Sequence, residues 1–198
     1  MLGLEALIMQ CAPDVAPTTM MAIIKVESNG NPWVIGNNTL KSSIKPTPKT
    51  KEEAVNAAKY YLSLGHSLDL GLAQINSNNL KRLGLTLDQV FDPCTNVAAG
   101  AVILKDFYLK ASAKYGDGQK ALMHAISGYN TGSLYRGHSY VTKVVKAANN
   151  GAPVNIPSLG NTQSTQKSFS KPSISSTDTK SNNSEILVDN SYSPMILR

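Results

Sequence analysis

One carboxyl group, Glu27, continues the apolar face of a predicted helix. Met20, Ile23 and Ile24 recur at the spacing of a single helix face, and Glu27 falls on the same face. A carboxyl group in apolar surroundings loses the hydration of its charged form, so its pKa should rise towards neutrality. Such a group can hold and donate a proton, which is what a general acid does. The alternative is that Glu27 reaches water at a frayed helix end or pairs with a basic residue, without a chemical role.

Two further segments combine glycines with amide or phenol side chains. Residues 68–76, LDLGLAQIN, place Gln74 in an apolar stretch, and residues 125–133, AISGYNTGS, place Tyr129 and Asn130 between glycines just past a predicted helix. These side chains suit a groove for a neutral polymer rich in hydroxyl and amide groups, such as an N-acetylated sugar chain. Each segment alone also has an ordinary explanation, as a satisfied core amide or as a turn.

The elements that must position these residues are predicted to be helices. Apolar periodicity, capping residues and glycine or proline stops predict an all-α domain over residues 1–150. Residues 34–49, with two prolines and several turn formers, are expected to be irregular or a small hairpin. An amphipathic first helix is expected over residues 1–12. A capping pattern, Thr50 with Glu53, begins a helix that stops at Gly65, and Thr86 with Gln89 caps a short turn. The other expected helices cover residues 18–28, 78–83, 96–116, 119–127 and 140–148.

Composition changes near residue 150. The 48 residues from 151 to 198 include 11 Ser, 4 Thr, 5 Asn and 4 Pro. Such a segment buries too little apolar surface to offset its ordering entropy, so we expect a disordered tail. The sequence therefore predicts two regions, a folded domain over 1–150 and a tail over 151–198.

Charge and composition exclude several function classes. The net charge is +6, but the basic residues form no run and no nucleic-acid recognition motif is present, so no nucleic-acid partner is expected. No apolar stretch is long enough to span a membrane. The histidines and cysteines have no metal-ligand spacing, so neither a metal nor another cofactor is expected. No residue before Lys25 is basic and Glu5 interrupts the first apolar stretch, so we expect no export signal there.

The two cysteines, Cys11 and Cys94, are far apart in the sequence. They could form one disulfide in an oxidising compartment or remain two buried thiols, and composition alone does not choose between these states.

In order and spacing, the polar motifs together resemble the catalytic domain of soluble lytic transglycosylases. The matching residues are Glu27-Ser28 followed by Gly30 and Pro32, GLAQIN at 71–76, the AxxGYNxG segment at 125–132, and Tyr140. The QCAP start, the VESNGNP turn and the FDPC segment are most similar to the peptidoglycan-cleaving component of type IV, or conjugative, secretion systems.

This resemblance implies a lysozyme-like helical fold with a sugar groove, and roles for individual residues. Glu27 matches the single catalytic acid and base, which cleaves the bond between N-acetylmuramic acid and N-acetylglucosamine without water and leaves a 1,6-anhydro ring. Ser28 and Gln74 match positions that contact the substrate or support the acid. The remaining matches are Tyr129, Asn130 and Tyr140, in the groove or orienting the acid, and Ile75 and Asn76, in the groove floor.

The resemblance also bears on mechanism and location. Asp69 is the nearest second carboxyl, and we expect it to be a structural cap. Where goose-type lysozymes read GLMQVD this chain has Asn76, whose amide cannot activate water, so the expectation is substrate-assisted cleavage by the sugar's acetamido group. Peptidoglycan is periplasmic, and in that compartment Cys11 and Cys94 would form a disulfide. Possible partners are other type IV secretion subunits.

Two other functions stay open at this stage. The first is hydrolysis, by a lysozyme-type muramidase or a chitinase. The second is a wall-binding assembly protein whose catalysis is dispensable, with the polar tail recruiting secretion subunits.

Overall fold

A computed structural model describes residues 3–150 as a helical domain with a small sheet. The predicted tail over 151–198 lies outside the described residues. The helices are α1 Leu4–Cys11, α2 Pro17–Ser28, α3 Lys51–Ser63, α4 Leu80–Leu83, α5 Leu87–Val90, α6 Pro93–Tyr115, α7 Gln119–Thr131 and α8 His138–Asn149, with a 3₁₀ turn over Ser77–Asn79; the strands are β1 Ile35–Asn37, β2 Ser42–Ser43, β3 Leu68–Leu70 and β4 Ile75–Asn76.

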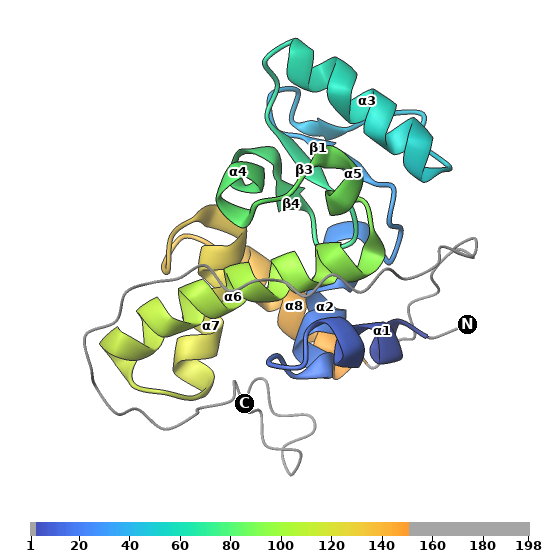
Figure 1. Ribbon diagram of the computed structural model, residues 1–198. Helices are drawn as coiled ribbons and strands as arrows, with labels where there is room; N and C mark the ends of the chain where they lie inside the picture. Colours follow the sequence, from blue (N-terminus) through green and yellow to red (C-terminus); the bar gives the residue numbers. More distant parts are fainter. Residues whose placement is uncertain (1–2, 151–198) are drawn as a thin grey trace.

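The long helix α6 is the axis of the domain. It crosses the middle of the molecule, with α3 and the strands on one side and α1, α2, α7 and α8 on the other (Figure 1). Helix α6 packs against α7 and α1, and α2 packs against α8. The predicted face of α2 supplies part of the core, because Met20, Ile23 and Ile24 are completely buried. The core therefore holds α2, which carries Glu27 in its last turn.

The domain is mainly helical, as predicted, and a small sheet accompanies the helices. Its four short antiparallel strands lie in the order β2-β1-β3-β4. The hairpin of β1 and β2 agrees with one of the two alternatives for residues 34–49. The other pair comes from the LDLGLAQIN segment, in which Leu68 and Leu70 are buried and Asp69 between them is partly exposed. This alternation is the signature of a half-buried strand, which a run of only three residues makes hard to recognise.

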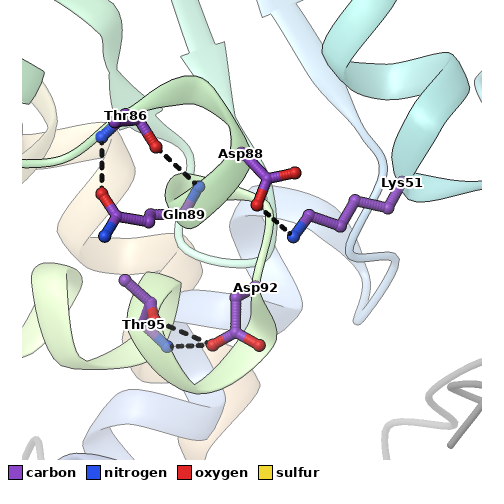
Figure 2. Close-up of polar contacts among 6 residues, drawn as sticks. All are labelled: Lys51, Thr86, Asp88, Gln89, Asp92 and Thr95. Carbon is purple, nitrogen blue, oxygen red and sulfur yellow. Dashed lines mark hydrogen bonds and ion pairs between the residues drawn. The ribbon is translucent and has the colours of Figure 1, made fainter. Parts of the chain in front are cut away.

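Local caps explain where the helices near the sheet begin. Thr86 and Gln89 form a reciprocal capping box at α5, as predicted, and Asp92 accepts from the Thr95 amide at the start of α6 (Figure 2). Helix α6 thus begins at Pro93 and not at the predicted Asn96. The first position of a helix is one that proline favours. Figure 2 also shows Lys51 at the start of α3 paired with Asp88 of α5, which links α3 to the rest of the domain.

Buried Asn96 holds the turn between β3 and β4. Its side chain accepts from the Ala73 amide at 2.7 Å and donates to the carbonyls of Leu70 and Val90, at 2.9 and 2.7 Å. Gly71 has a φ of +77°, and a Cβ there would lie 2.4 Å from the Asn96 amide nitrogen. Only glycine fits this position, which explains on steric grounds why the GLAQIN motif begins with glycine.

A disulfide joins Cys11, at the end of α1, to Cys94, in the first turn of α6, with Cα atoms 5.3 Å apart. This resolves the choice between free thiols and a disulfide. A bridge closing such a long loop stabilises a small domain by about 2–5 kcal/mol.

No helix within residues 3–150 is long and apolar enough to cross a membrane.

Candidate active site

A cleft of about 570 Å³ lies between the end of α2, the sheet, and the facing surfaces of α6 and α7. Its volume is in the range of clefts that bind small ligands. Five predicted site residues line it: Glu27, Gln74, Asn76, Tyr129 and Asn130. The remaining lining residues are Asn38, Asp69, Asn79, Arg82, Ile103, Asp106, Phe107, Lys110, Gly128 and Gly132.

Glu27 lies in the last turn of α2, with its carboxyl group facing the cleft. The helix ends just beyond it because Asn29 and Gly30 adopt left-handed backbone conformations, with φ of 52° and 80°. Burial raises the pKa of Glu27 from 4.5 to about 7; a hydrogen bond from Tyr140 opposes the increase, and the negative charge of Asp69 adds to it. The carboxyl group can therefore hold a proton near neutral pH and release it, as a general acid must.

Tyr140 is a hydrogen-bond partner of this carboxyl group. It projects from α8, is buried, and its hydroxyl donates to Glu27 Oε1 at 2.5 Å. Burial, followed by the charge of Glu27, raises the pKa of Tyr140 far above its ordinary value. Tyr140 is thus a permanent donor, and it is not among the residues that line the cleft. Its position fits the predicted acid-orienting role.

Tyr129 connects the helices to the sheet. Its hydroxyl donates to the Ala73 carbonyl at 2.6 Å, and burial raises its pKa well above the ordinary value, with a further contribution from the charge of Glu27. The contact needs Gly100 of α6, where a Cβ would come within 3.0 Å of the Tyr129 hydroxyl and 2.8 Å of the Ala73 Cβ. Tyr129 therefore fixes the distance between α7 and the turn before β4.

Tyr129 and Asn130 lie inside the last turns of α7, and not past the helix end as the glycines suggested. Gly128 continues the helix because its missing side chain makes room for Phe107: a Cβ would lie 2.4 Å from that ring. The helix ends at Gly132, which has a φ of +70°. The exposed side chain of Asn130 lies on the cleft surface.

The amide of Gln74 is directed at the backbone. Its Nε2 donates to the carbonyls of Val34 and Gly71, at 3.1 and 2.9 Å, and its own φ is +49°. The side-chain oxygen lies toward Gly36, where a Cβ would be 2.9 Å from it. Gln74 thus holds the turn between β3 and β4 against the chain before β1, while lining the cleft.

Two predicted substrate residues are not among those that line the cleft. Ser28 is buried, donates to the Ile24 carbonyl and accepts from the Gly30 amide, both at 3.2 Å. Ile75 of β4 is in the core, with 1% of its surface exposed. Both side chains support the elements that bear Glu27 and Gln74.

Asp69 is the site residue that the sequence interpretation placed wrongly. It is not a cap: it lies in β3, lines the cleft, and accepts hydrogen bonds from Asn38 Nδ2 at 2.9 Å and from Asn76 Nδ2 at 2.8 Å. The cleft is thus lined by Asp69 and Asp106 as well as by Glu27. The alternation of Leu68, Asp69 and Leu70 was the available signal, since it turns Asp69 away from the core.

Charged groups also line the cleft beyond these residues. Arg82 and Asp106 form an ion pair at 2.7 Å, and the Lys110 ammonium lies 5.1 Å from the centre of the Phe107 ring. Within residues 3–150 no three His, Cys, Asp or Glu side chains are grouped so that they could hold a metal ion.

Comparisons with known proteins agree with the motifs. The family model described as "Transglycosylase SLT domain" matches residues 7–152. The chain is 42% identical over 147 residues to the type IV secretion system protein virB1 of Brucella suis biovar 1, a match that covers 70% of this chain and 61% of the relative. It is 41% identical over 149 residues to protein virB1 of Agrobacterium tumefaciens, covering 74% and 61%. The match thus covers about 61% of the length of these relatives. No solved structure matches significantly.

Proposed function

The chain belongs to the transglycosylase SLT domain family, and from this premise we propose that it is a lytic transglycosylase of bacterial peptidoglycan. The observation that supports this most directly is the carboxyl group of Glu27, with its pKa raised to about 7, bonded by Tyr140 and facing a cleft. A protonated carboxyl group in that position is suited to donate its proton to a glycosidic oxygen.

In the proposed reaction Glu27 first acts as an acid. It gives its proton to the glycosidic oxygen between N-acetylmuramic acid and N-acetylglucosamine, and the bonding electrons leave with that oxygen. The 6-hydroxyl of the muramic acid then bonds to the anomeric carbon, and its proton returns to Glu27. The products are a free 4-hydroxyl and a 1,6-anhydro ring, and no water is consumed.

The groove residues would hold the glycan in place for this step. Asn130 presents an exposed amide to the cleft, and Gln74 lines it with an amide that the backbone holds fixed. Amides both donate and accept, so they suit the hydroxyl and acetamido groups of the sugar chain. We propose Tyr129, Ser28 and Ile75 as supports of this surface, and Asn76 as part of its floor.

The biological setting follows from the relatives. The Brucella relative is named as a type IV secretion system protein, which supports a role in opening the cell wall locally for such a machine. The site of action would be the periplasm, and a disulfide between Cys11 and Cys94 is suited to that oxidising compartment. We propose residues 1–150 as the catalytic domain and 151–198 as an appended segment that contacts other secretion subunits.

The test is a product analysis. Purified protein is incubated with peptidoglycan, and the released fragments are identified by mass spectrometry. We expect 1,6-anhydromuropeptides. The absence of any released fragment would contradict the proposal.

Hydrolysis is the second candidate, because Asp69 places a second carboxyl group in the cleft. Ordinary glycosidases use two carboxyl groups. Fragments with reducing ends in place of anhydro rings would identify the protein as a muramidase.

A further inference from the structure

We propose that a group of lysines and aromatic rings beyond the end of the cleft binds the carboxylates of the peptides attached to peptidoglycan strands, so that the protein favours peptide-bearing strands over strands without peptides. This inference rests on the proposed function and gives it a substrate preference. We call the group the lysine–aromatic cluster, and its members are Lys114, Tyr115, Lys120, His124 and Tyr135.

The rings of the cluster come from three segments of the chain and pack against one another. Tyr115 of α6 and His124 of α7 are stacked with ring centres 4.1 Å apart, and Tyr135, from the loop after α7, meets both rings edge-on. His124 Nδ1 donates to the Leu134 carbonyl at 2.7 Å, which ties that loop to α7. The rings therefore form a defined platform and are not independent surface side chains.

Two ammonium groups lie over this platform. Lys114 Nζ is 5.6 Å from the centre of the Tyr115 ring and 4.9 Å from that of Tyr135, and it also donates to the Tyr135 hydroxyl. Lys120 Nζ is 5.0 Å from the centre of the Tyr115 ring. The attraction between a cation and a ring face holds each ammonium group near its ring. Both lysines are exposed, so their charges face solvent and can meet a ligand.

Within residues 3–150 no carboxylate is paired with the lysines of the cluster. The ion pairs in that part of the chain involve other lysine and arginine side chains. Residues 107–137 carry four Lys or Arg residues and a single acidic residue, Asp117. The surface thus fits an anionic ligand, and a carboxylate bound there would accept charge-assisted hydrogen bonds from Lys114 and Lys120.

The cluster continues the cleft along α6. Lys110 lines the cleft, and Lys114 follows it by about one helical turn on the same face. Gly132, which also lines the cleft, begins the loop that carries Tyr135. Four residues of helix rise by about 6 Å, so the cluster starts close to the end of the cleft.

Peptidoglycan offers carboxylates at such a distance. Its sugar rings are neutral, and each N-acetylmuramic acid carries a short peptide with several carboxylates. An extended peptide of about four residues spans about 13 Å, more than the step from Lys110 to Lys114. A peptide on a sugar bound in the cleft can therefore bring a carboxylate to the cluster. Removing the peptide leaves only the lactyl carboxylate, which stays beside the sugar.

The experiment measures KM and kcat on two soluble substrates. One is glycan strands that carry their peptides, and the other is the same strands after an amidase has removed the peptides. The variant Lys114→Gln/Lys120→Gln removes both charges, and Lys114→Arg/Lys120→Arg keeps them. Lys59→Gln is the matched control, because Lys59 is an exposed lysine on α3 outside the cleft and the cluster. Melting temperatures show whether each variant keeps the fold.

Wild type should have a lower KM for the strands with peptides than for those without. For the glutamine variant we expect KM on peptide-bearing strands to rise about tenfold with kcat unchanged, the effect of losing two exposed charge contacts. Its KM on strands without peptides should equal that of wild type. The arginine variant and Lys59→Gln should behave as wild type. High salt should raise the KM of wild type on peptide-bearing strands towards that of the glutamine variant.

An unchanged KM of the glutamine variant on peptide-bearing strands would overturn the inference. So would an equal rise in KM on both substrates, because that result would assign the lysines to sugar binding or to the packing of α6 and α7. If wild-type protein releases no fragments from either substrate, it is the proposed function that fails, before any variant is compared.

Discussion

The two sides of the cleft place a carboxyl group in opposite environments. On the helical side, formed by α2, α6 and α7, burial raises the pKa of Glu27 to about 7. On the strand side, formed by β3, β4 and the residue after β1, Asp69 accepts from the side-chain amides of Asn38 and Asn76. The difference shows that the supporting elements set the role of each carboxyl group, since a helix face can dehydrate a group that a short strand leaves well bonded.

The largest predicted effect comes from removing the acid on the helical side. Glu27→Gln should lower activity about 1,000-fold or more, because the amide has no proton to give to the leaving oxygen. Release of anhydromuropeptides measures this. Glu52→Gln, an exposed residue in the first turn of α3, is the control and should match wild type.

The same variant separates catalysis from assembly. Full activity of Glu27→Gln would show that Glu27 is not the acid. Loss of activity combined with normal secretion in cells would show that a wall-binding assembly role, and not cleavage, is what the secretion machine requires.

The second prediction concerns the frame that both sides share. Replacing Cys11 and Cys94 together by alanine should lower the free energy of unfolding by about 2–5 kcal/mol, because the unfolded chain regains the freedom that the disulfide removes. Urea unfolding measures the loss. Neither cysteine lines the cleft, so the pH profile of the remaining folded enzyme should stay as in wild type. A shifted pH profile would show that the disulfide also positions the carboxyl groups.

The third prediction uses the dehydration of Glu27 directly. Its pKa is about 7 in the folded chain and near 4.5 when unfolded, so the folded state binds the proton more tightly. This contribution to stability is fully present below pH 4.5 and is lost as the pH rises through 7, a decrease of about 3 kcal/mol. Glu27→Gln should lack this decrease and be more stable than wild type at pH 8. If wild type and Glu27→Gln have the same unfolding curve at pH 5, and again the same curve at pH 8, the prediction is wrong.

The smallest predicted effect comes from the phenol behind the acid. The hydrogen bond from Tyr140 holds the pKa of Glu27 down, so Tyr140→Phe should raise that pKa and move the alkaline limb to higher pH. Loss of orientation should lower kcat about tenfold. The control is Tyr60→Phe, an exposed tyrosine on α3, for which no shift is expected.

The helical side could be predicted from the sequence in some detail. Four positions on the α2 face, ending with Glu27, follow from 3.6-residue periodicity alone, and the structure buries the three apolar ones completely. The stop after Ser28 and the capping box at Thr86 are equally local, because each depends on residues within one turn. Local patterns of this kind do not depend on the rest of the fold.

The strand side could not be predicted in the same way. Strands of two or three residues have almost no periodic signal, so Asp69 was assigned as a cap although Leu68 and Leu70 flank it. Its hydrogen bonds to Asn38 and Asn76 join segments whose proximity depends on the antiparallel pairing of β1 with β3 and of β3 with β4. The family resemblance indicated the motifs, but not which of their side chains point into the cleft.

The sequence by itself determined the helices, the acid on its apolar face and the family to which the chain belongs, because these depend on residue spacing within single segments. Only the tertiary structure decided that Tyr140 bonds Glu27, that Ser28 and Ile75 support the site without lining it, and that Asp69 shares the cleft. Tyr140 and Asp69 lie 113 and 42 residues from Glu27, and these distances in space are set by how the helices pack against one another and how the strands pair.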